Sequence, residues 1–293
     1  SRLGIDYESL KAINPRIILG SISGFGQDGP YAKRPGFDQI AQGMGGLMSI
    51  TGLPGQGPVR VGIPIADLTA GLFCAHGIMV ALFERERSGV GQWVHTSLLQ
   101  AQLFMLDFQG ARYTVDGDVP QQAGNNHPTS IPTGVFETSD GFINIAVAGQ
   151  TTWERFARAV GGEAWLDHPD YATGEARSAN RDALNEAINE KTRTYSSDNL
   201  IEVLIDAGCP CGEINDIGAA FDNPQVKHLR MSQPVNSAVM GEINLVSQPV
   251  KLERTPSHFE VAPPERGEHT DEVLTSLGYN EAQIAALRDQ QVV

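Results

Sequence analysis

The chain has 293 residues, of which 41% are hydrophobic, and this is enough to form one large domain or two smaller ones. Its formal net charge of −14 argues against a general affinity for nucleic acids or anionic membranes, because like charges repel. The three cysteines make neither an even disulfide framework nor paired metal ligands, so we expect no bound metal, a reducing environment and a cytoplasmic location.

The beginning of the chain predicts an incomplete fold. Ser1 is not a start Met, no signal peptide follows it, and a short charged helix leads at once into a strand pattern. We therefore expect an N-terminal part of the fold to be missing from this chain.

The first third of the chain alternates strand and helix patterns, as α/β folds do. Residues 15–26 predict a β-branched strand followed by a glycine turn, and residues 37–50 have a glycine-rich helical pattern. A second strand pattern, at 59–66, comes before an apolar helix at 67–87, and residues 92–113 predict a short strand and a long helix. The apolar run Leu68–Phe83 is shorter than the about 20 residues of a membrane span, so we expect a buried helix.

The rest of the chain predicts a second, smaller domain. Asp140-Gly141 stands between two apolar runs, which is a strong signal for an antiparallel hairpin, and charged helices that end at glycines follow it. A polar segment rich in Pro, Gly and amides connects this region to the first. We therefore divide the chain into part of a large domain, 1–115, a linker, 116–132, a small α+β domain, 133–235, and a final segment, 236–293.

A single carboxylate, Asp67, lies between the two apolar runs of GIPIADLTAGLF, residues 62–73. Asp is a preferred helix N-cap, because its oxygen accepts a backbone N–H bond and its charge meets the positive end of the helix dipole. The same place would aim an ionised carboxylate out of a strand end, where open α/β sheets bind ligands. The local pattern favours a cap, and a nucleophile stays open.

Other candidate residues have no diagnostic spacing. His76 lies in the apolar helix and is predicted to be a core residue, and His95 is predicted at a strand end; neither has a paired acid. The serines lack a GxSxG elbow, and the glycine-rich segments match neither GxGxxG nor a P-loop. One residue separates Cys209 from Cys211, unlike a redox CxxC motif, so we predict a packed loop there.

Five separated blocks of sequence are more specific than any single residue. They begin with NPRIILGSISGFG and PIADLTAGLF and end with GCPCGEINDIG and APPERGEHTDEVL, and they cover residues 14–52, 64–94, 124–147, 208–226 and 262–279. Together, and in this order, they resemble the class III CoA-transferase family, which includes formyl-CoA, carnitine-CoA and succinyl-CoA-dependent transferases and the α-methylacyl-CoA racemases. Relative to full-length members, the chain is expected to lack roughly the first quarter.

The resemblance implies a fold and an assembly. The expected fold is α/β, with a Rossmann-like large domain built from both chain ends, to which residues 236–293 return, and a smaller α+β domain. Two such subunits are expected to form an interlocked homodimer.

The resemblance also implies a reaction, because Asp67 falls on the position of the family's catalytic aspartate. The expected enzyme is a CoA-transferase, which moves coenzyme A from an acyl-CoA donor to a free carboxylic acid. The CoA passes through acyl-aspartyl anhydrides and an aspartyl-CoA thioester on this residue. No tightly bound cofactor is expected, since acyl-CoA and a small carboxylic acid are the substrates.

Residues in the motif loops are candidates for contacts with CoA. Three cations could meet its phosphates, with plain surface solvation as the competing interpretation. An aromatic residue and an amide are expected to line the cleft by resemblance, while two glycines would permit close backbone approach. Asp38 is expected to be structural. The expected contacts are Lys33, Arg34, Phe37, Gln42, Gly45, Gly46 and Arg60.

The linker holds a second group of candidates, Gly124, Asn125, Asn126 and His127, close to the place where formyl-CoA transferases carry a mobile glycine loop. Such a loop could close over the site and keep water from the anhydrides. Here two asparagines and a histidine replace glycines, so a lid role is doubtful, and a substrate contact is expected for His127.

Two alternatives remain open. A racemase would need two opposed acid/base groups, but this chain has Phe37 at the first place and Gln150 or Thr151 near the second, and none of these can shuttle a proton. The transferase is therefore preferred. A non-catalytic CoA-binding protein or truncated product is the other alternative, which the expected loss of the N-terminal part favours. The sequence leaves the acyl-CoA donor and the acceptor acid undetermined.

Overall fold

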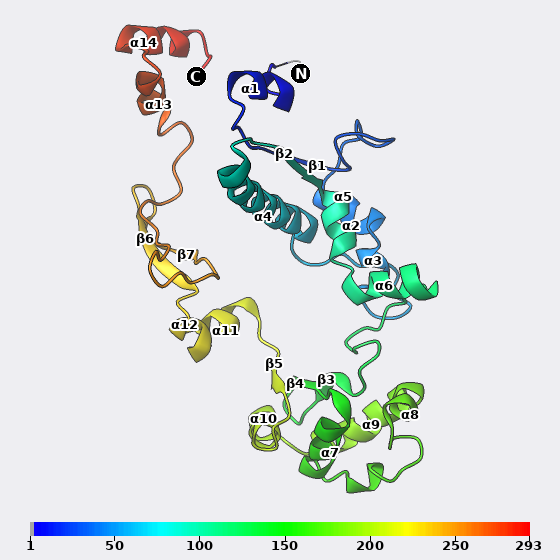
Figure 1. Ribbon diagram of the computed structural model, residues 1–293. Helices are drawn as coiled ribbons and strands as arrows, with labels where there is room; N and C mark the ends of the chain where they lie inside the picture. Colours follow the sequence, from blue (N-terminus) through cyan, green and yellow to red (C-terminus); the bar gives the residue numbers. More distant parts are fainter. Residues whose placement is uncertain (1–2) are drawn as a thin grey trace. The chain divides into compact units, whose positions relative to one another are not determined.

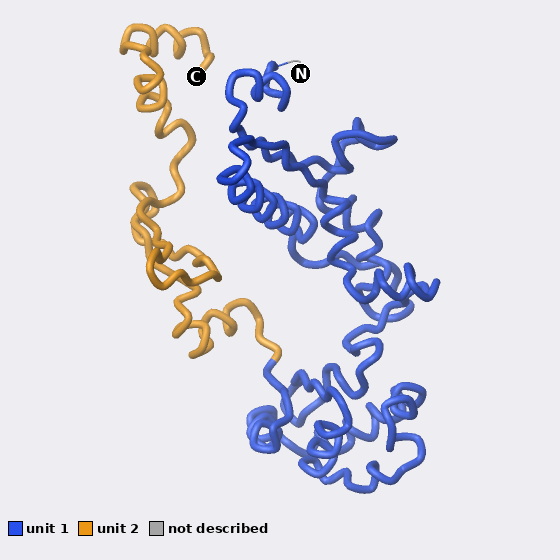
Figure 2. Tube along the Cα trace, viewed as in Figure 1, with its two compact units in different colours: residues 1–213 blue, residues 214–293 orange. Residues whose placement is uncertain are grey.

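The computed structural model describes residues 3–293, which divide into two compact units, unit 1 up to Glu213 and unit 2 from Ile214 to Val293 (Figure 2). The boundary between them follows the last strand of the second core described below. Each unit is described by itself.

The first part of unit 1 contains a parallel pair of strands, β1 and β2, joined in register from Leu19↔Trp93 to Ser23↔Ser97. Helix α4 connects the two strands and contacts both of them, which makes a βαβ arrangement (Figure 1). The elements are α1 (Tyr7–Ile13), β1 (Leu19–Ser23), α2 (Asp38–Met44), α3 (Leu47–Ile50), α4 (Ile65–Ser88), β2 (Trp93–Ser97), α5 (Leu98–Phe104) and α6 (Asp107–Asp116).

Two of the three strands predicted in this part are present, as β1 and β2. The strand predicted at 59–66 is wrong, because residues 59–64 are irregular and α4 already begins at Ile65. The β-branched residues there join no ladder, and their backbone is held by side chains instead, as described below. The long helix predicted after β2 is divided into α5 and α6.

The second part of unit 1 is a three-stranded antiparallel sheet in the order β3-β4-β5, with helices around it. The β3–β4 hairpin turns at Asp140-Gly141, which confirms the hairpin prediction. Its elements are β3 (Thr133–Glu137), β4 (Phe142–Ala146), α7 (Gly149–Ala159), the 3₁₀ helix η1 (Glu163–Trp165), α8 (Gly174–Ala179), α9 (Arg181–Thr192), α10 (Ser197–Asp206) and β5 (Cys211–Glu213).

Unit 2 contains one antiparallel hairpin and four short helices among its described residues. The strand-like run from residue 243 falls on the second strand of the hairpin, and two short helices end the segment 236–293. The elements are α11 (Ile217–Asp222), α12 (Pro224–His228), β6 (Ser232–Ser237), β7 (Gly241–Val246), α13 (Thr270–Ser276) and α14 (Glu281–Asp289).

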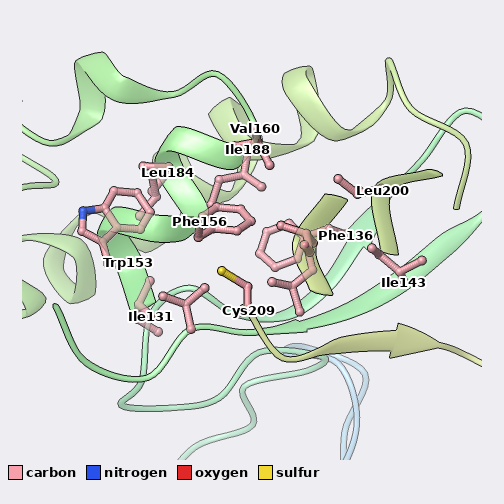
Figure 3. Packing of buried hydrophobic residues seen from close by; sticks show 14 residues of the cluster. Ile131, Phe136, Ile143, Trp153, Phe156, Val160, Leu184, Ile188, Leu200 and Cys209 are labelled. Carbon is pink, nitrogen blue, oxygen red and sulfur yellow. The ribbon is translucent and has the colours of Figure 1, made fainter. Parts of the chain in front are cut away.

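Unit 1 holds two hydrophobic cores of different composition. The core between the three-stranded sheet and its helices is built from large side chains, with the Phe136 and Phe156 rings pointing into its centre (Figure 3). The core between α2, α4 and α5 is built mostly from alanines. The first, here called the aromatic core, includes Ile131, Phe136, Ile143, Ile145, Trp153, Phe156, Leu184, Ile188, Leu200 and Leu204. The second, here called the alanine core, consists of Ala41, Ala66, Ala70, Leu98 and Ala101.

The prediction that α4 is a buried helix is wrong for most of its surface. Apolar side chains such as Leu72, Met79 and Phe83 are exposed, with 70% of Leu72 accessible. By length and composition α4 could cross a membrane, since its most apolar 18-residue window has a mean hydropathy of 1.7 and is 28% buried. Its contacts with β1, β2, α2 and α5 are those of a crossover helix, and we interpret it as one.

The predicted α/β class is thus confirmed as a mixed α/β arrangement of helices and small sheets. The sheets within residues 3–293 have two, three and two strands. The Rossmann-like large domain and the interlocked dimer are taken up below as proposals.

Candidate active site

Asp67 lies in the first turn of α4 and is exposed. The helix starts at Ile65, Pro64 holds the N-cap position, and no side chain of the helix itself caps it. Asp67 is therefore the third residue of α4, and the prediction that Asp67 is the N-cap of this helix is wrong. The carboxylate accepts no hydrogen bond from any residue that the structure describes.

A different carboxylate caps α4. Asp38, the first residue of α2, accepts a 2.8 Å hydrogen bond from the backbone N–H of Ala66 through Oδ1. The N–H of Ile65 donates to the carbonyl of Ile63 at 2.8 Å, and the N–H of Leu68 donates to Pro64 at 3.0 Å. Within residues 3–293, the N–H of Asp67 is thus the one first-turn donor left without an acceptor.

Gln42, one turn after Asp38 on α2, completes the support of this segment. Its Nε2 donates to Asp38 Oδ2 at 2.7 Å and to the carbonyl of Ile63 at 3.3 Å. Its Oε1 accepts from the N–H of Val61 at 2.9 Å. Arg60 Nη2 lies 3.9 Å from Asp38 Oδ2. We call Asp38 and Gln42 the α2 clamp, because together they hold residues 61–66, which lead directly to Asp67.

The remaining predicted residues flank α2 and contact their neighbours in the chain or in α5. Phe37 holds the N-cap position of α2, and 76% of it is exposed. A Cβ on Gly45 would lie 2.5 Å from Gln102 Cγ and 2.8 Å from the carbonyl of Ala41, so Gly45 lets α5 approach α2 closely. Gly46 has a φ of +82° between α2 and α3.

Lys33 and Arg34 lie in a loop that closes on itself. A Cβ on Gly24 would lie 2.8 Å from the Cα of Gly36, so the two ends of the loop touch. Inside it, the Arg34 guanidinium stacks 3.7 Å over the centroid of the Tyr31 ring. Lys33 and Arg34 are both exposed, as a site for phosphates requires.

The linker candidates are firmly held. Asn126 forms a bridge with Gly134 and accepts a 2.8 Å hydrogen bond from Asn185. The His127 ring stacks on Phe108 at 5.5 Å, and its Nδ1 accepts from the backbone N–H of Ser130 at 2.9 Å. Such contacts do not suit a freely moving lid.

Gly124 and Asn125 are the other two linker candidates. Gly124 has a φ of +61°, and a Cβ there would lie 3.1 Å from Leu53 Cδ2. Asn125 is exposed, and its carbonyl lies against Gly134. No hydrogen bond, ion pair or ring contact joins the four linker candidates to Asp67 in residues 3–293.

The structure thus brings Asp38, Gln42 and Arg60 to the segment that carries Asp67. Within residues 3–293, no hydrogen bond or ion pair joins Lys33 or Arg34 to this segment. Sequence reasoning missed the capping role of Asp38, because the bond to Ala66 spans 28 residues. It also missed the close packing of Gln102 against Gly45.

The other sequence candidates do not form a site. His76 is exposed on α4, so its prediction as a core residue is wrong. Burial raises the pKa of the Cys209 and Cys211 thiols, as expected for packed thiols rather than reactive thiolates. No group of three metal-binding side chains occurs among the residues described.

Comparison with known proteins gives a consistent family. The family model described as "CoA-transferase family III" matches residues 1–270. The chain is 36% identical to the succinate–glutarate CoA-transferase of Agrobacterium fabrum, over 94% of this chain and 69% of that protein. It is 32% identical to the succinyl-CoA–D-citramalate CoA-transferase of Chloroflexus aurantiacus, over 99% of this chain and 73% of that protein.

Solved structures agree on the fold. A CaiB/BaiF family protein from Brucella suis superposes with a TM-score of 0.79 at 34% identity, over 94% of this chain and 72% of that chain. A Mycobacterium tuberculosis protein gives a TM-score of 0.81 at 20% identity, over 92% of this chain and 71% of that chain. The second likeness concerns the fold alone.

Proposed function

Since the chain belongs to CoA-transferase family III, we propose that it moves coenzyme A from an acyl-CoA donor to a free carboxylic acid with Asp67 as the nucleophile. One observation supports this assignment most strongly. Asp67 is exposed in the first turn of α4, while Asp38 caps the helix, so the Asp67 carboxylate is not needed for capping. A carboxylate free of structural bonds is available for covalent chemistry.

In the proposed reaction, an Asp67 oxygen attacks the thioester carbonyl of the donor, and the CoA thiolate leaves. The resulting acyl-aspartyl anhydride is attacked by the thiolate at the aspartyl carbonyl, which releases the donor acid and leaves an aspartyl-CoA thioester. The acceptor carboxylate attacks this thioester, and the returning thiolate attacks the acceptor carbonyl of the second anhydride. The products are the acceptor acyl-CoA and the free Asp67 carboxylate.

The end of α4 offers stabilisation for the oxyanions of these steps. The unpaired N–H of Asp67 and the positive end of a 24-residue helix both favour negative charge near the carboxylate. A donor of this kind can contribute about 10²-fold or more in rate. The linker residues are held by contacts of their own, so we propose no moving lid.

The CoA phosphates are proposed to meet exposed cations. Lys33 and Arg34 share one closed loop, and Arg60 lies beside the clamp, next to the segment that leads to Asp67. Exposed cations are needed for phosphates in a chain whose net charge is −14. The exposed Phe37 ring adds an apolar surface for the CoA chain. Gly45 and Gly46 are proposed to bring the backbone close to CoA.

The substrate class is proposed from the relatives. Both CoA-transferases above are named for succinate or succinyl-CoA, and a human relative that is 29% identical is named succinyl-CoA:glutarate CoA-transferase. We therefore propose succinyl-CoA as a donor and short dicarboxylic acids as acceptors. Mass spectrometry of the CoA esters formed with glutarate, oxalate and acetate would show whether dicarboxylates are preferred.

The assembly is proposed to be a homodimer with a Rossmann-like large domain. The β1–α4–β2 arrangement is one βαβ unit of such a domain. The exposed apolar face of α4 supports a partner surface, since contiguous apolar patches are costly in water. Light scattering would contradict the dimer if it gave the mass of one chain, 31.5 kDa.

A racemase is less well supported. Phe37 has no acid or base, and Gln150 accepts hydrogen bonds from Arg177 at 3.3 Å, as a positioned amide rather than a proton carrier. Washout of α-deuterium from a 2-methylacyl-CoA would restore the racemase interpretation.

The nucleophile is tested by Asp67→Asn and Asp67→Ala. We expect transfer of CoA from succinyl-CoA to glutarate to fall on the order of 10³-fold or more, because no covalent intermediate can form. Asp116→Asn, an exposed acid at the end of α6, is the matched control. Hydroxylamine should trap an adduct at Asp67 in the parent protein only. Transfer at the parent rate in either Asp67 variant would disprove the proposal, and an absent adduct would favour a CoA-binding protein.

A further inference from the structure

The α2 clamp connects a helix that does not carry the nucleophile to the turn that does. We propose that Asp38 and Gln42 are positioning residues, which fix the first turn of α4 and thereby the Asp67 carboxylate for attack on the thioester. This inference rests on the proposed role of Asp67 in the reaction. The clamp itself is a structural arrangement that can be tested without that role.

The geometry gives the clamp three attachment points in six residues. Asp38 Oδ1 accepts from the N–H of Ala66 at 2.8 Å, and Gln42 Oε1 accepts from the N–H of Val61 at 2.9 Å. Gln42 Nε2 donates to the carbonyl of Ile63 at 3.3 Å. Residues 61–64 have no regular secondary structure, and Pro64 gives the helix neither an N–H nor a capping side chain. The hydrogen bonds of the clamp therefore fix this segment. The segment before Asp67 is therefore held from one side by α2.

The donors and acceptors around Gln42 allow one orientation of its side-chain amide. An ionised carboxylate only accepts, so Asp38 Oδ2 requires the NH₂ of Gln42, at 2.7 Å. The Gln42 carbonyl oxygen must then face the donor of Val61, as it does. Flipping the amide would place Oε1 against both Asp38 and the carbonyl of Ile63. Asp38 and Gln42 are 7% and 0% exposed, and polar groups are stable in such buried places only if they are paired.

The same burial excludes direct substrate contact in the arrangement seen. Gln42 is fully enclosed, and its amide is occupied on both atoms. In this proposal the effect of Gln42 on catalysis passes through the backbone of residues 61–66, in place of the CoA contact expected from the resemblance. A small displacement of a reacting group is costly, since a misplacement of about 1 Å can reduce the rate about 10²-fold.

The alanine core provides the close approach that the clamp needs. Ala41 of α2 packs in this core with Ala66 and Ala70 of α4. Larger side chains at these places would separate α2 from α4 and lengthen the bond between Asp38 and Ala66. The α2 clamp and the alanine core thus fix together the position of the first turn of α4.

An exchange of the two functional groups tests the clamp. In Asp38→Asn, one donor of the new amide faces the NH₂ of Gln42, and in Gln42→Glu two carboxylates face each other where a 2.7 Å bond was. The double variant Asp38→Asn/Gln42→Glu restores a donor–acceptor pair between positions 38 and 42, and the carboxylate introduced at position 42 would still accept from Val61. It loses the 3.3 Å donation to the carbonyl of Ile63, so the recovery is partial. We expect each single variant to lower kcat about 10- to 100-fold, with KM for acyl-CoA changed less than about threefold. The double variant should recover about tenfold of this loss.

Hydrogen exchange gives a readout that does not depend on activity. In Asp38→Ala, amide protection should fall at the bonded amides of residues 61–66, while residues 69–88 of α4 should keep theirs. If Asp38→Ala does not fold, the same comparison is made between Asp38→Asn and the double variant, in which protection should return.

Three results would overturn the proposal. They are a kcat within about twofold of the parent in both single variants, a rise in KM without a fall in kcat, and a double variant no better than the weaker single variant. A failure of the proposed function would look different, because Asp67→Asn would then transfer CoA at the parent rate. The hydrogen-exchange measurements would still show whether the clamp holds residues 61–66.

Discussion

The two hydrophobic cores of unit 1 differ in composition and in what they contribute to the molecule. The aromatic core buries Trp153, Phe156 and several branched residues and encloses large apolar surface (Figure 3). The alanine core buries little apolar surface per residue, and beside it lie the buried polar side chains of Asp38 and Gln42. Apolar burial is not directional, whereas hydrogen bonds fix orientation. The comparison indicates that one core supplies stability and the other sets the geometry of the candidate site.

The largest expected effect is the loss of a large side chain from the aromatic core. Phe156→Ala should lower the free energy of unfolding by about 3–5 kcal/mol, because it removes buried area and leaves a cavity. Urea denaturation measures this change. Phe142→Ala on β4 is the matched control, since that ring is 57% exposed and should cost far less. Equal losses in the two variants would break the assignment of stability to the aromatic core.

The alanine core should respond to enlargement instead. Ala70→Leu should cost about 1–3 kcal/mol of unfolding free energy, because the added atoms must push α4 from its neighbours. It should also lower CoA transfer, since the clamp would be pulled from Ala66. Ala75→Leu, on the exposed side of the same helix, should stay within about 0.5 kcal/mol of the parent. A fully active Ala70→Leu variant would contradict a positioning role for this core.

The smallest expected effect concerns the pH dependence of stability at the β3–β4 hairpin. Asp140 Oδ1 accepts from the N–H and the hydroxyl of Ser197, both at 2.8 Å, and from Thr138. The backbone bond from Ser197, followed by the hydroxyl bonds, holds the pKa of Asp140 below its ordinary value of 3.8. A lowered carboxyl pKa stabilises the folded state above the ordinary value, and this contribution is lost as pH falls through the folded pKa.

Asp140→Asn should therefore unfold at lower urea concentration than the parent at neutral pH, and the difference should shrink below about pH 4. The exposed Asp206→Asn, on α10, serves as control. A difference that grew on acidification would have the wrong sign for this explanation.

Local patterns predicted much of the fold. The hairpin follows from Asp140-Gly141, whose short turn chemistry needs no distant residue. Helix ends were also visible, as at α4, which stops at Gly89 in a left-handed conformation. The exposure of α4 was not predictable, because periodicity shows which residues are apolar and not what covers them.

The candidate site was predictable only in part. Asp67 could be singled out as a lone charge among apolar residues, and its place on the family's motif gave it a chemical role. Its surroundings depend on contacts between distant residues. The cap from Asp38 spans 28 residues, and a local rule assigned that task to the nearest acid instead. Long-range side-chain bonds of this kind leave no periodic signal in one sequence.

The two halves of the linker, residues 116–132, form hydrogen bonds with different parts of unit 1. Gln122 donates to the carbonyls of Thr51 and Gly57, at 2.6 and 2.7 Å, whereas Asn126 is bonded to Asn185. Its two halves therefore belong to different parts of unit 1. A chimera that exchanges residues 133–213 between related proteins should be spliced between Ala123 and Asn126, so that each parent keeps the hydrogen bonds of its own half of the linker.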